Sequence, residues 1–219
     1  MIHFSHVYKT YSGGVHALSN VDLEIRKGEF LFLTGPSGAG KTTLFRMISG
    51  FDIATSGKLV VEGYDLSRVG QREIPYLRRK IGVVFQDFRL LKARTIFENV
   101  ALPLQIKSER ASYVQKRTQE VLDQVGLIYK SKFFPEQLSG GEQQRVAIAR
   151  AIVHQPGILI ADEPTGNLDP YLTEEIMDLL VKVNSQGTTV FVASHDHEMV
   201  KKRARRVVEI KSGKIIGDR

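Results

Sequence analysis

The stretch GPSGAGKT at residues 35–42 constrains the fold of this chain more than any other. It follows FLFLT, which predicts a buried strand over residues 30–34, and it precedes a helical pattern that runs from Lys41 to Ser49. Glycines allow the backbone to fold tightly, so that consecutive N–H groups can point toward an anion. A loop of the form GxxxxGK(S/T) between a strand and a helix therefore predicts a nucleotide site.

Two side chains of this loop have predicted chemical roles. Lys41 supplies a positive charge to the β- and γ-phosphates, and the Thr42 hydroxyl is a ligand for Mg²⁺. The remaining residues that we expect to contact the nucleotide here are Gly35, Pro36, Ser37, Gly38, Ala39, Gly40 and Thr43.

Apolar segments alternate with helical patterns along the chain, and this order predicts an α/β fold with a parallel sheet. Strands are expected near residues 2–4, 21–25, 30–34, 59–61, 81–85, 158–162, 189–194 and 207–210. Helices are expected over residues 41–49, 140–154 and 172–185. Between about residues 88 and 156 helical patterns take over, and we interpret this block as a helical insert into the sheet-containing core.

One helix of this block has a clear apolar face, formed by Val114, Val121, Leu122 and Val125. Ser108 is a candidate N-cap of this helix, and Gly126 is a candidate stop signal.

A second chemical signal is ILIADEP at residues 158–164, an apolar strand that ends in two carboxylates. In a protein with a phosphate-binding loop, Asp162 is expected near Mg²⁺. Glu163 would then lie where a general base could act on the attacking water. The alternative is a strand end with capping acids, but two adjacent like charges after an apolar strand favour a nearby cation.

A third signal is LSGGEQQ at residues 138–144, a glycine-paired turn that opens into the helical pattern RVAIARAIV. Its backbone N–H groups could hold an anion. A helix N-terminus contributes only about 0.3–1 kcal/mol to an exposed anion, whereas millimolar binding requires about 4 kcal/mol. The stretch is therefore expected to be one half of a larger site, and the spacing leaves open whether one chain or two supply the halves.

Five motifs in this order resemble an ABC-type ATPase domain over essentially the whole chain: GPSGAGKT at 35–42, LSGGEQ at 138–143, the Walker B strand at 158–163, GNLD at 166–169 and SHD at 194–196. The resemblance implies a P-loop NTPase fold with a RecA-like parallel sheet core, an N-terminal antiparallel β subdomain and an inserted helical subdomain. It also implies that residues 1–219 form a single nucleotide-binding domain, with the helical subdomain at about 88–156.

The resemblance assigns further residues. Tyr11 matches the aromatic residue that stacks on adenine, although a strand-edge tyrosine is the plain alternative. Gln86 matches the glutamine that reaches Mg²⁺ and the attacking water, and His195 matches the histidine that contacts the γ-phosphate. The implied catalytic residues are thus Glu163, His195, Gln86 and Lys41, and the implied metal ligands are Thr42, Gln86 and Asp162.

The resemblance also implies a head-to-tail homodimer with two ATP molecules between its subunits. The residues contributed from the second subunit would be Ser139, Gly140, Gly141, Glu142 and Asp169. ATP would hold the dimer closed, and hydrolysis would let it open.

Within the family, EPTGNLD and the FQ-x-x-x-LL-x-x-x-T-x-x-ENVALPL pattern at 85–104 resemble the branch of lipoprotein-release, macrolide-export and cell-division ATPases. The likeness is greatest to the cell-division (FtsE) type. This implies a polytopic membrane partner of the FtsX type that docks near Phe85–Val100 and a role in controlling peptidoglycan hydrolysis. The alternative is the ATPase subunit of a lipoprotein-release or macrolide exporter.

Charge and composition narrow the remaining classes. The chain has a net charge of +7 and no cysteine, which excludes disulfides and thiolate metal sites. Basic residues gather at Arg78–Lys80, at Arg89, Lys92 and Arg94, and at Lys201–Arg206; each group alone is most simply a solvated surface, but together they fit an anionic membrane face. The apolar runs are shorter than the ~20 residues of a membrane helix. We therefore expect a soluble chain, and the resemblance implies that it is peripheral on the inner face of the cytoplasmic membrane.

Two other classes are disfavoured. DNA-repair ATPases of related architecture carry a long coiled coil between the phosphate-binding loop and the LSGG motif, and this chain has no sustained heptads between Lys41 and Ser139, so no nucleic acid is expected. A catalytically dead binding module is disfavoured because every catalytic position holds a competent residue.

Overall fold

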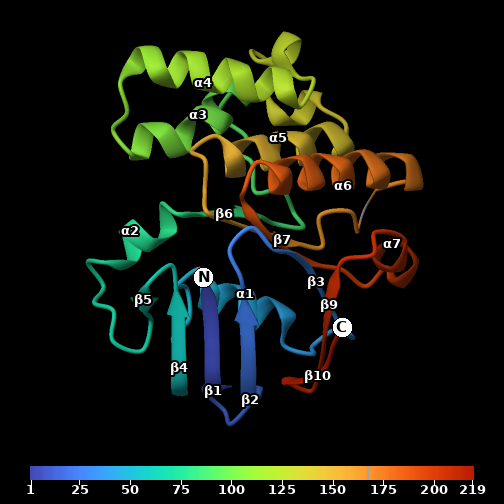
Figure 1. Ribbon diagram of the computed structural model, residues 1–219. Coiled ribbons are helices and arrows are strands. Elements are labelled where there is room, and N and C mark those ends of the chain that lie inside the picture. The colour runs from blue at the N-terminus through green and yellow to red at the C-terminus, as the bar shows by residue number, and fades with distance from the viewer. Residues whose placement is uncertain (167) are drawn as a thin grey trace.

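A six-stranded sheet forms the centre of the structure, a computed structural model that describes residues 1–166 and 168–219 (Figure 1). Its strand order is β10-β9-β3-β8-β7-β6, and all neighbours are parallel except the antiparallel pair β10 and β9. The strands are β3 (Phe30–Thr34), β6 (Ile81–Val84), β7 (Ile158–Asp162), β8 (Thr189–Ala193), β9 (Arg206–Lys211) and β10 (Lys214–Asp218). The predicted α/β fold with a parallel sheet is confirmed.

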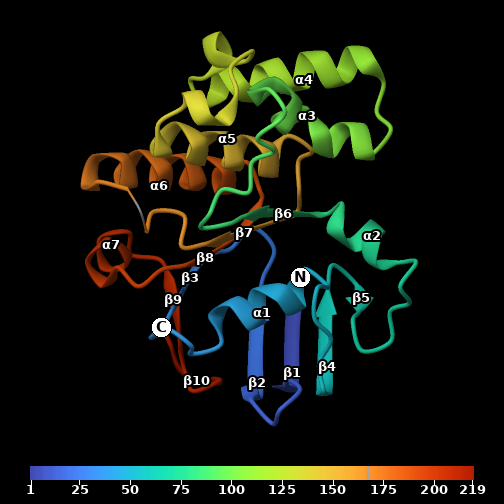
Figure 2. The same cartoon turned by 180° about the vertical axis from the view of Figure 1, so that it is seen from behind.

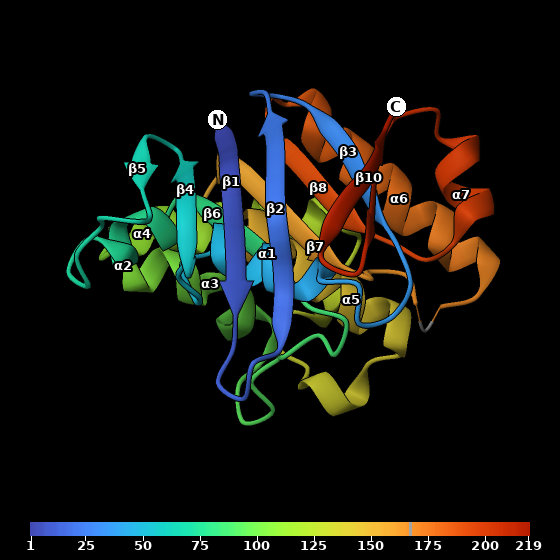
Figure 3. The same cartoon turned by 90° about the horizontal axis from the view of Figure 1, so that it is seen from below.

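A second, antiparallel sheet lies at the N-terminal end of the chain and has the order β2-β1-β4-β5. Its strands are β1 (Ile2–Thr10), β2 (His16–Ile25), β4 (Ser56–Val61) and β5 (Tyr64–Asp65). Figure 3 shows β1, β2 and β4 side by side, with α1 behind them. This is the antiparallel β subdomain that the resemblance implies.

Helices cover both faces of the six-stranded sheet, as the two opposite views in Figures 1 and 2 show. On one face lie α3 (Ile96–Ile106), α4 (Ala111–Gln124), α5 (Gly140–Ile152) and α6 (Pro170–Ser185). On the other face α1 (Lys41–Ile48) packs between this sheet and the antiparallel one. The short helices are α2 (Ile74–Arg78), α7 (His197–Lys202) and two 3-10 turns at Ile128–Lys130 and Pro135–Gln137.

Within residues 1–166 and 168–219, no helix combines the length and the hydropathy needed to cross a bilayer.

The strands of the central sheet send alternate side chains into two separate cores. In β3, Phe30 and Phe32 belong to the core under α3–α6, whereas Leu31 and Leu33 belong to the core around α1. Successive side chains of a strand point to opposite faces, so a sheet covered on both sides requires continuous apolar runs. This explains why FLFLT and ILIA contain no polar residue before their last position.

The helical block between β6 and β7 contains α3, α4 and α5, which confirms the helical insertion as part of the fold class. Its bounds at 88–156 and the single-domain division of residues 1–219 stay predictions. Gly126 ends α4 as expected, with a positive φ of 70° directly after the C-cap Val125. Ser108 was wrong as the N-cap: it has a φ of 57°, and α4 begins at Ala111 after Arg110, whose side chain makes no capping bond.

Candidate active site

The phosphate-binding loop joins the end of β3 to the start of α1, and two of its glycines are required by close backbone neighbours. A Cβ at Gly40 would lie 2.7 Å from the carbonyl oxygen of Ala17 in β2, and Gly40 has a φ of 112°. A Cβ at Gly35 would lie 2.1 Å from the carbonyl oxygen of Ile210 in β9. Any other residue at these positions would push the loop away from the strands that support it.

Lys41 points into this loop. Its Nζ donates hydrogen bonds to the carbonyl oxygens of Gly35 (2.7 Å) and Pro36 (3.1 Å), and the residue is 7% exposed. The other predicted contacts follow the backbone of the loop: Pro36, Ser37 and Gly38 are exposed, Ala39 is buried, and Thr43 is half-buried in the first turn of α1. The ammonium group is therefore held against the loop in which an anion is expected to bind.

Thr42 and Asp162 meet although 120 residues separate them in the chain. The Thr42 hydroxyl donates a hydrogen bond of 3.1 Å to Oδ2 of Asp162, at the end of β7. Burial raises the pKa of Asp162, and the neighbouring Glu163 carboxylate adds to this rise. A cation at this point would favour the ionised carboxylate.

These two oxygen donors fit Mg²⁺, which prefers oxygen ligands and is usually held by one or two protein groups together with phosphate oxygens and water. Among residues 1–166 and 168–219, no cluster of three or more His, Cys, Asp or Glu side chains could hold a metal by itself. The arrangement thus suits a metal that arrives with the phosphates of a nucleotide.

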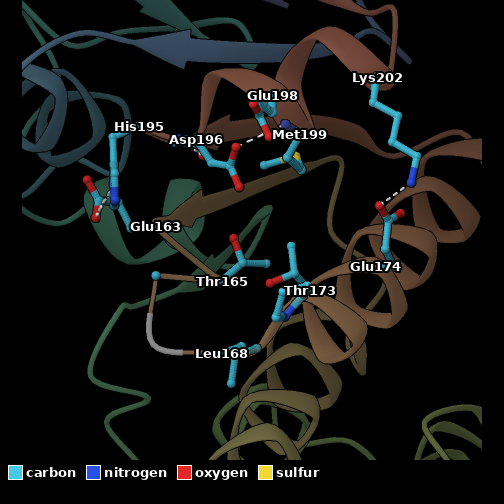
Figure 4. A pocket seen from close by; sticks show the side chains of 13 residues that line it. Glu163, Thr165, Leu168, Thr173, Glu174, His195, Asp196, Glu198, Met199 and Lys202 are labelled. Atoms are coloured by element: carbon cyan, nitrogen blue, oxygen red, sulfur yellow. Dashed lines mark hydrogen bonds and ion pairs between the residues drawn. The ribbon is translucent and has the colours of Figure 1, made fainter.

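Glu163 and His195 form the next pair, at the ends of β7 and β8. Nδ1 of His195 lies 3.1 Å from Oε2 of Glu163 (Figure 4). The Glu163 side chain is 19% exposed, whereas that of His195 is 65% exposed. Glu163 has a φ of 47°, and its N–H donates to the carbonyl oxygen of Ala193 in β8. A non-glycine residue in this region is strained, and such residues cluster at functional sites.

Asp196, the last residue of SHD, serves the helix that follows. Its side chain accepts a hydrogen bond of 3.0 Å from the N–H of Met199 and so caps α7. Because His195 directly precedes this cap, the start of α7 fixes the backbone that carries the histidine.

Gln86 follows β6 and approaches the same carboxylate. A Cβ placed on Gly166 would lie 3.5 Å from Oε2 of Glu163 and 3.7 Å from Nε2 of Gln86. The side chains of Gln86 and Glu163 therefore converge on Gly166. The structure brings Gln86, Asp162, Glu163 and His195 to one edge of the sheet, as the motifs predict.

Tyr11 lies just beyond β1, beside the first turn of α1. Its hydroxyl donates a hydrogen bond of 2.6 Å to Oδ2 of Asp52 and lies 3.4 Å from Oγ1 of Thr43. Sequence reasoning missed Asp52 because the surrounding stretch FDIATSG indicates only a loop.

The LSGGEQ segment begins α5 with a reciprocal capping box. Ser139 Oγ accepts from the N–H of Glu142 (3.3 Å), and the N–H of Ser139 donates to Oε2 of Glu142 (3.0 Å). Lys130 pairs with Glu142 and is the main cause of the lowered pKa of that carboxyl. The N–H groups of Gly140 and Gly141 belong to the first turn, where a helix offers no intrahelical acceptor.

Helix α6 packs against the same segment. A Cβ at Gly141 would lie 2.8 Å from Cδ1 of Leu172, so glycine allows α5 and α6 to approach closely. Asp169 caps α6 by accepting a hydrogen bond of 3.0 Å from the N–H of Leu172. Of the GNLD motif, residue 167 lies outside the described residues.

The LSGGEQ segment and the phosphate-binding loop belong to different sides of the molecule. Helix α5 packs in the core with α3, α4 and α6, whereas α1 packs in the core on the opposite face of the central sheet (Figures 1 and 2). Within one chain the structure therefore brings together the predicted catalytic residues but not the two predicted phosphate-binding segments.

Comparison with known proteins agrees with this architecture. The sequence profile of the ABC transporter family matches residues 18–166, and the chain belongs to this family. The cell division ATP-binding protein FtsE of Bacillus subtilis (strain 168) is 50% identical over 218 residues, which cover 100% of this chain and 96% of that protein. The FtsE protein of Escherichia coli (strain K12) is 48% identical over 217 residues, covering 99% of this chain and 98% of that protein.

A solved structure with the same fold is a dimeric ATP-binding cassette in a post-hydrolysis state bound to ADP and Pi. It superimposes with a TM-score of 0.91 and 39% identity, covering 100% of this chain and 98% of that one. The predicted family and fold class are thus confirmed.

Proposed function

We propose that the chain is the Mg²⁺-dependent ATP-hydrolysing subunit of a dimeric membrane complex. The observation that carries this proposal is the convergence of Thr42, Asp162, Glu163 and His195 beyond the carboxyl ends of parallel strands. Ligands of open α/β sheets bind at this edge. Membership of the ABC transporter family supports ATP as the ligand.

Each residue has a role that follows from its position. Lys41 exchanges its contacts with two loop carbonyls for the β- and γ-phosphates, and Tyr11 stacks on adenine. Thr42 and Asp162 hold Mg²⁺ with help from Gln86; the metal supplies charge stabilisation to the phosphoryl oxygens.

Glu163 orients the attacking water and takes its proton. His195 holds the carboxylate through Nδ1 and contacts the γ-phosphate.

Replacing Glu163 tests this assignment. Glu163→Gln keeps the shape of the side chain but removes the proton acceptor, so we expect kcat to fall by about 10²–10⁴-fold while MgATP still binds and dimers accumulate. The matched control is Glu198→Gln on α7, an exposed carboxylate near the same site, which should keep its activity. Hydrolysis by Glu163→Gln at the rate of the unaltered protein would exclude Glu163 as the base.

The proposed dimer explains why the two predicted phosphate-binding segments lie apart in one chain. The first turn of α5 is too weak an anion site by itself, and it lies on the opposite side of the sheet from α1. A second copy in a two-fold arrangement would bring its Ser139, Gly140, Gly141, Glu142 and Asp169 to the nucleotide held by the first. The likeness to a dimeric cassette supports this arrangement.

The surface for a membrane partner is an apolar groove that shares Phe85 with the expected docking segment Phe85–Val100 and continues beyond both ends of it, to Val83 and Leu102. Its apolar lining comprises Phe51, Ile81, Val83, Phe85, Leu102 and Ile106, and its basic lining comprises Arg78, Arg79, Lys107 and Arg150. Phe51 and Ile106 are 50% and 60% exposed. Among the described residues that line the groove there is no Asp or Glu, so the groove suits a helix with an apolar face and flanking carboxylates.

We assign this groove to a cytoplasmic helix of an FtsX-type protein, with the chain peripheral on the inner face of the cytoplasmic membrane. The biological role is then control of peptidoglycan hydrolysis in cell division. The names of the FtsE relatives support the part in cell division. No specific observation favours the lipoprotein-release alternative.

Ile106→Glu tests the groove, because it places a negative charge on the exposed apolar lining. We expect cosedimentation with proteoliposomes that contain an FtsX-type protein to fall at least about tenfold, while MgATP binding stays unchanged. The control Ile216→Glu alters a residue that is 54% exposed on β10 and should sediment normally. Equal loss, or no loss, in both variants would contradict the assignment.

A further inference from the structure

The hydroxyl group of Tyr11 is attached to α1 through an acidic side chain. Oδ2 of Asp52 accepts a hydrogen bond of 2.6 Å from Tyr11 and one of 2.7 Å from Nε of Arg46. Oδ1 of Asp52 accepts a further bond of 3.2 Å from Nη2 of Arg46. The Asp52 side chain is only 12% exposed. Hydrogen bonds to ionised groups are about twice as strong as neutral ones, so this link is well suited to fix a ring.

The charges of this group keep donor and acceptor in place. The Arg46 guanidinium lowers the pKa of Asp52, so the carboxylate remains ionised at neutral pH. Burial raises the pKa of Tyr11, and the hydrogen bond to Asp52 raises it further, so the phenol keeps its proton. The hydroxyl is therefore the donor and the carboxylate the acceptor under ordinary conditions.

The backbone around this link is also joined on both sides. Lys9 Nζ donates to the carbonyl oxygen of Ile53 (2.8 Å) and lies 5.0 Å from the centroid of the Tyr11 ring. The N–H of Thr10 donates to Oγ1 of Thr55 (2.9 Å), and the N–H of Asp52 donates to the carbonyl oxygen of Arg46 (3.3 Å). The end of β1 and the segment after α1 thus hold each other at several points.

We propose that Asp52, supported by Arg46, is a positioning residue that fixes the Tyr11 ring at a set distance from the phosphate-binding loop. This rests on the proposed function, in which Tyr11 stacks on adenine. Arg46 lies four residues after Thr42 in α1, so one helical turn separates the residue that supports Asp52 from the residue proposed to hold the metal. The base site and the triphosphate site are then parts of one rigid unit, and nucleotide binding need not order the ring first.

Two conservative substitutions test the link. Tyr11→Phe keeps the ring and removes the hydroxyl, and Asp52→Asn keeps the shape and removes the charge. For each we expect the Kd and KM of MgATP to rise about five- to tenfold, with kcat within about twofold. Binding of Mg-tripolyphosphate, which has no base, should be unchanged. The matched control is Asp65→Asn. Asp65 is a carboxylate in β5, in the antiparallel sheet that also contains β1, and it pairs with Lys58 and Arg68.

The double variant distinguishes positioning from general stability. If the two side chains act as one link, Tyr11→Phe/Asp52→Asn should bind MgATP no more weakly than the weaker single variant. Additive losses, or an equal loss of tripolyphosphate binding, would overturn the proposal. An unchanged preference for MgATP over tripolyphosphate in Tyr11→Phe would overturn it too, and this variant leaves the Asp52–Arg46 pair intact should Asp52→Asn fold poorly.

Failure of the proposed function gives a different result. If the unaltered protein does not bind MgATP, the nucleotide assignment itself is wrong. If Tyr11→Ala binds MgATP as well as the unaltered protein does, Tyr11 is not the adenine platform. Only when both of these measurements support the site does the behaviour of Tyr11→Phe report on Asp52.

Discussion

At the scale of single residues, His154 connects the stability of the chain to pH. Burial and, as a smaller cause, the nearby Lys107 charge lower its pKa from 6.5 to about 4. Between these pH values the unfolded chain takes up a proton that the folded chain does not. The free energy of unfolding therefore falls as the pH drops from 6.5 toward 4, by about 2 kcal/mol between pH 7 and pH 5. The contribution of this residue levels off below the folded pKa of about 4.

Urea denaturation checks this prediction. The decrease in unfolding free energy between pH 7 and pH 5 should be smaller by about 2 kcal/mol in His154→Gln than in the unaltered protein. The control is His197→Gln, an exposed position on α7, which should keep the original pH dependence. Equal pH dependence in His154→Gln and the unaltered protein would show that His154 is not the cause.

At the scale of elements, the predictions succeeded where a continuous apolar pattern defines the element and failed at the end of a helix and at the edge of the sheet. Strands β3 and β7 were predicted because burial on both faces imposes continuous apolar sequence. Helix α6 was predicted from residue 172, but it begins at Pro170 because Asp169 caps it. Strand β10 was missed, because its extended conformation depends on pairing with β9 at the edge of the sheet.

The candidate site likewise has a part that the sequence predicts and a part that it does not. Thr42, Asp162, Glu163 and His195 stand at the ends of predicted strands or at the start of a predicted helix, so the order of elements brings them together. The Tyr11–Asp52 bond joins residues 41 positions apart outside any motif, and only the folded chain reveals it. In contrast, the capping box of α5 could have been predicted, because Ser139 and Glu142 have the S-x-x-E spacing of that motif.

At the scale of the whole molecule, the central sheet separates the two segments that can bind phosphate. The first turn of α5 opens on the side of the larger helical core, and the loop before α1 opens beside the antiparallel sheet. A single chain therefore offers one complete set of the predicted catalytic side chains and one isolated helix N-terminus. Two copies related by a two-fold axis would use both segments of both chains.

Mixed dimers test this arrangement directly. Lys41→Ala removes the charge from the phosphate-binding loop, and Ser139→Arg blocks the start of α5; each homodimer should be inactive because both of its sites are damaged. In a dimer of one Lys41→Ala chain and one Ser139→Arg chain, both defects fall in the same site, and the other site is intact. An equal mixture should therefore recover ATPase activity, about a quarter of that of the unaltered protein if chains pair at random and sites act independently. If copurification through a different affinity tag on each chain detects the mixed dimer but its ATPase activity stays at the level of the two homodimers, the site is not shared between chains.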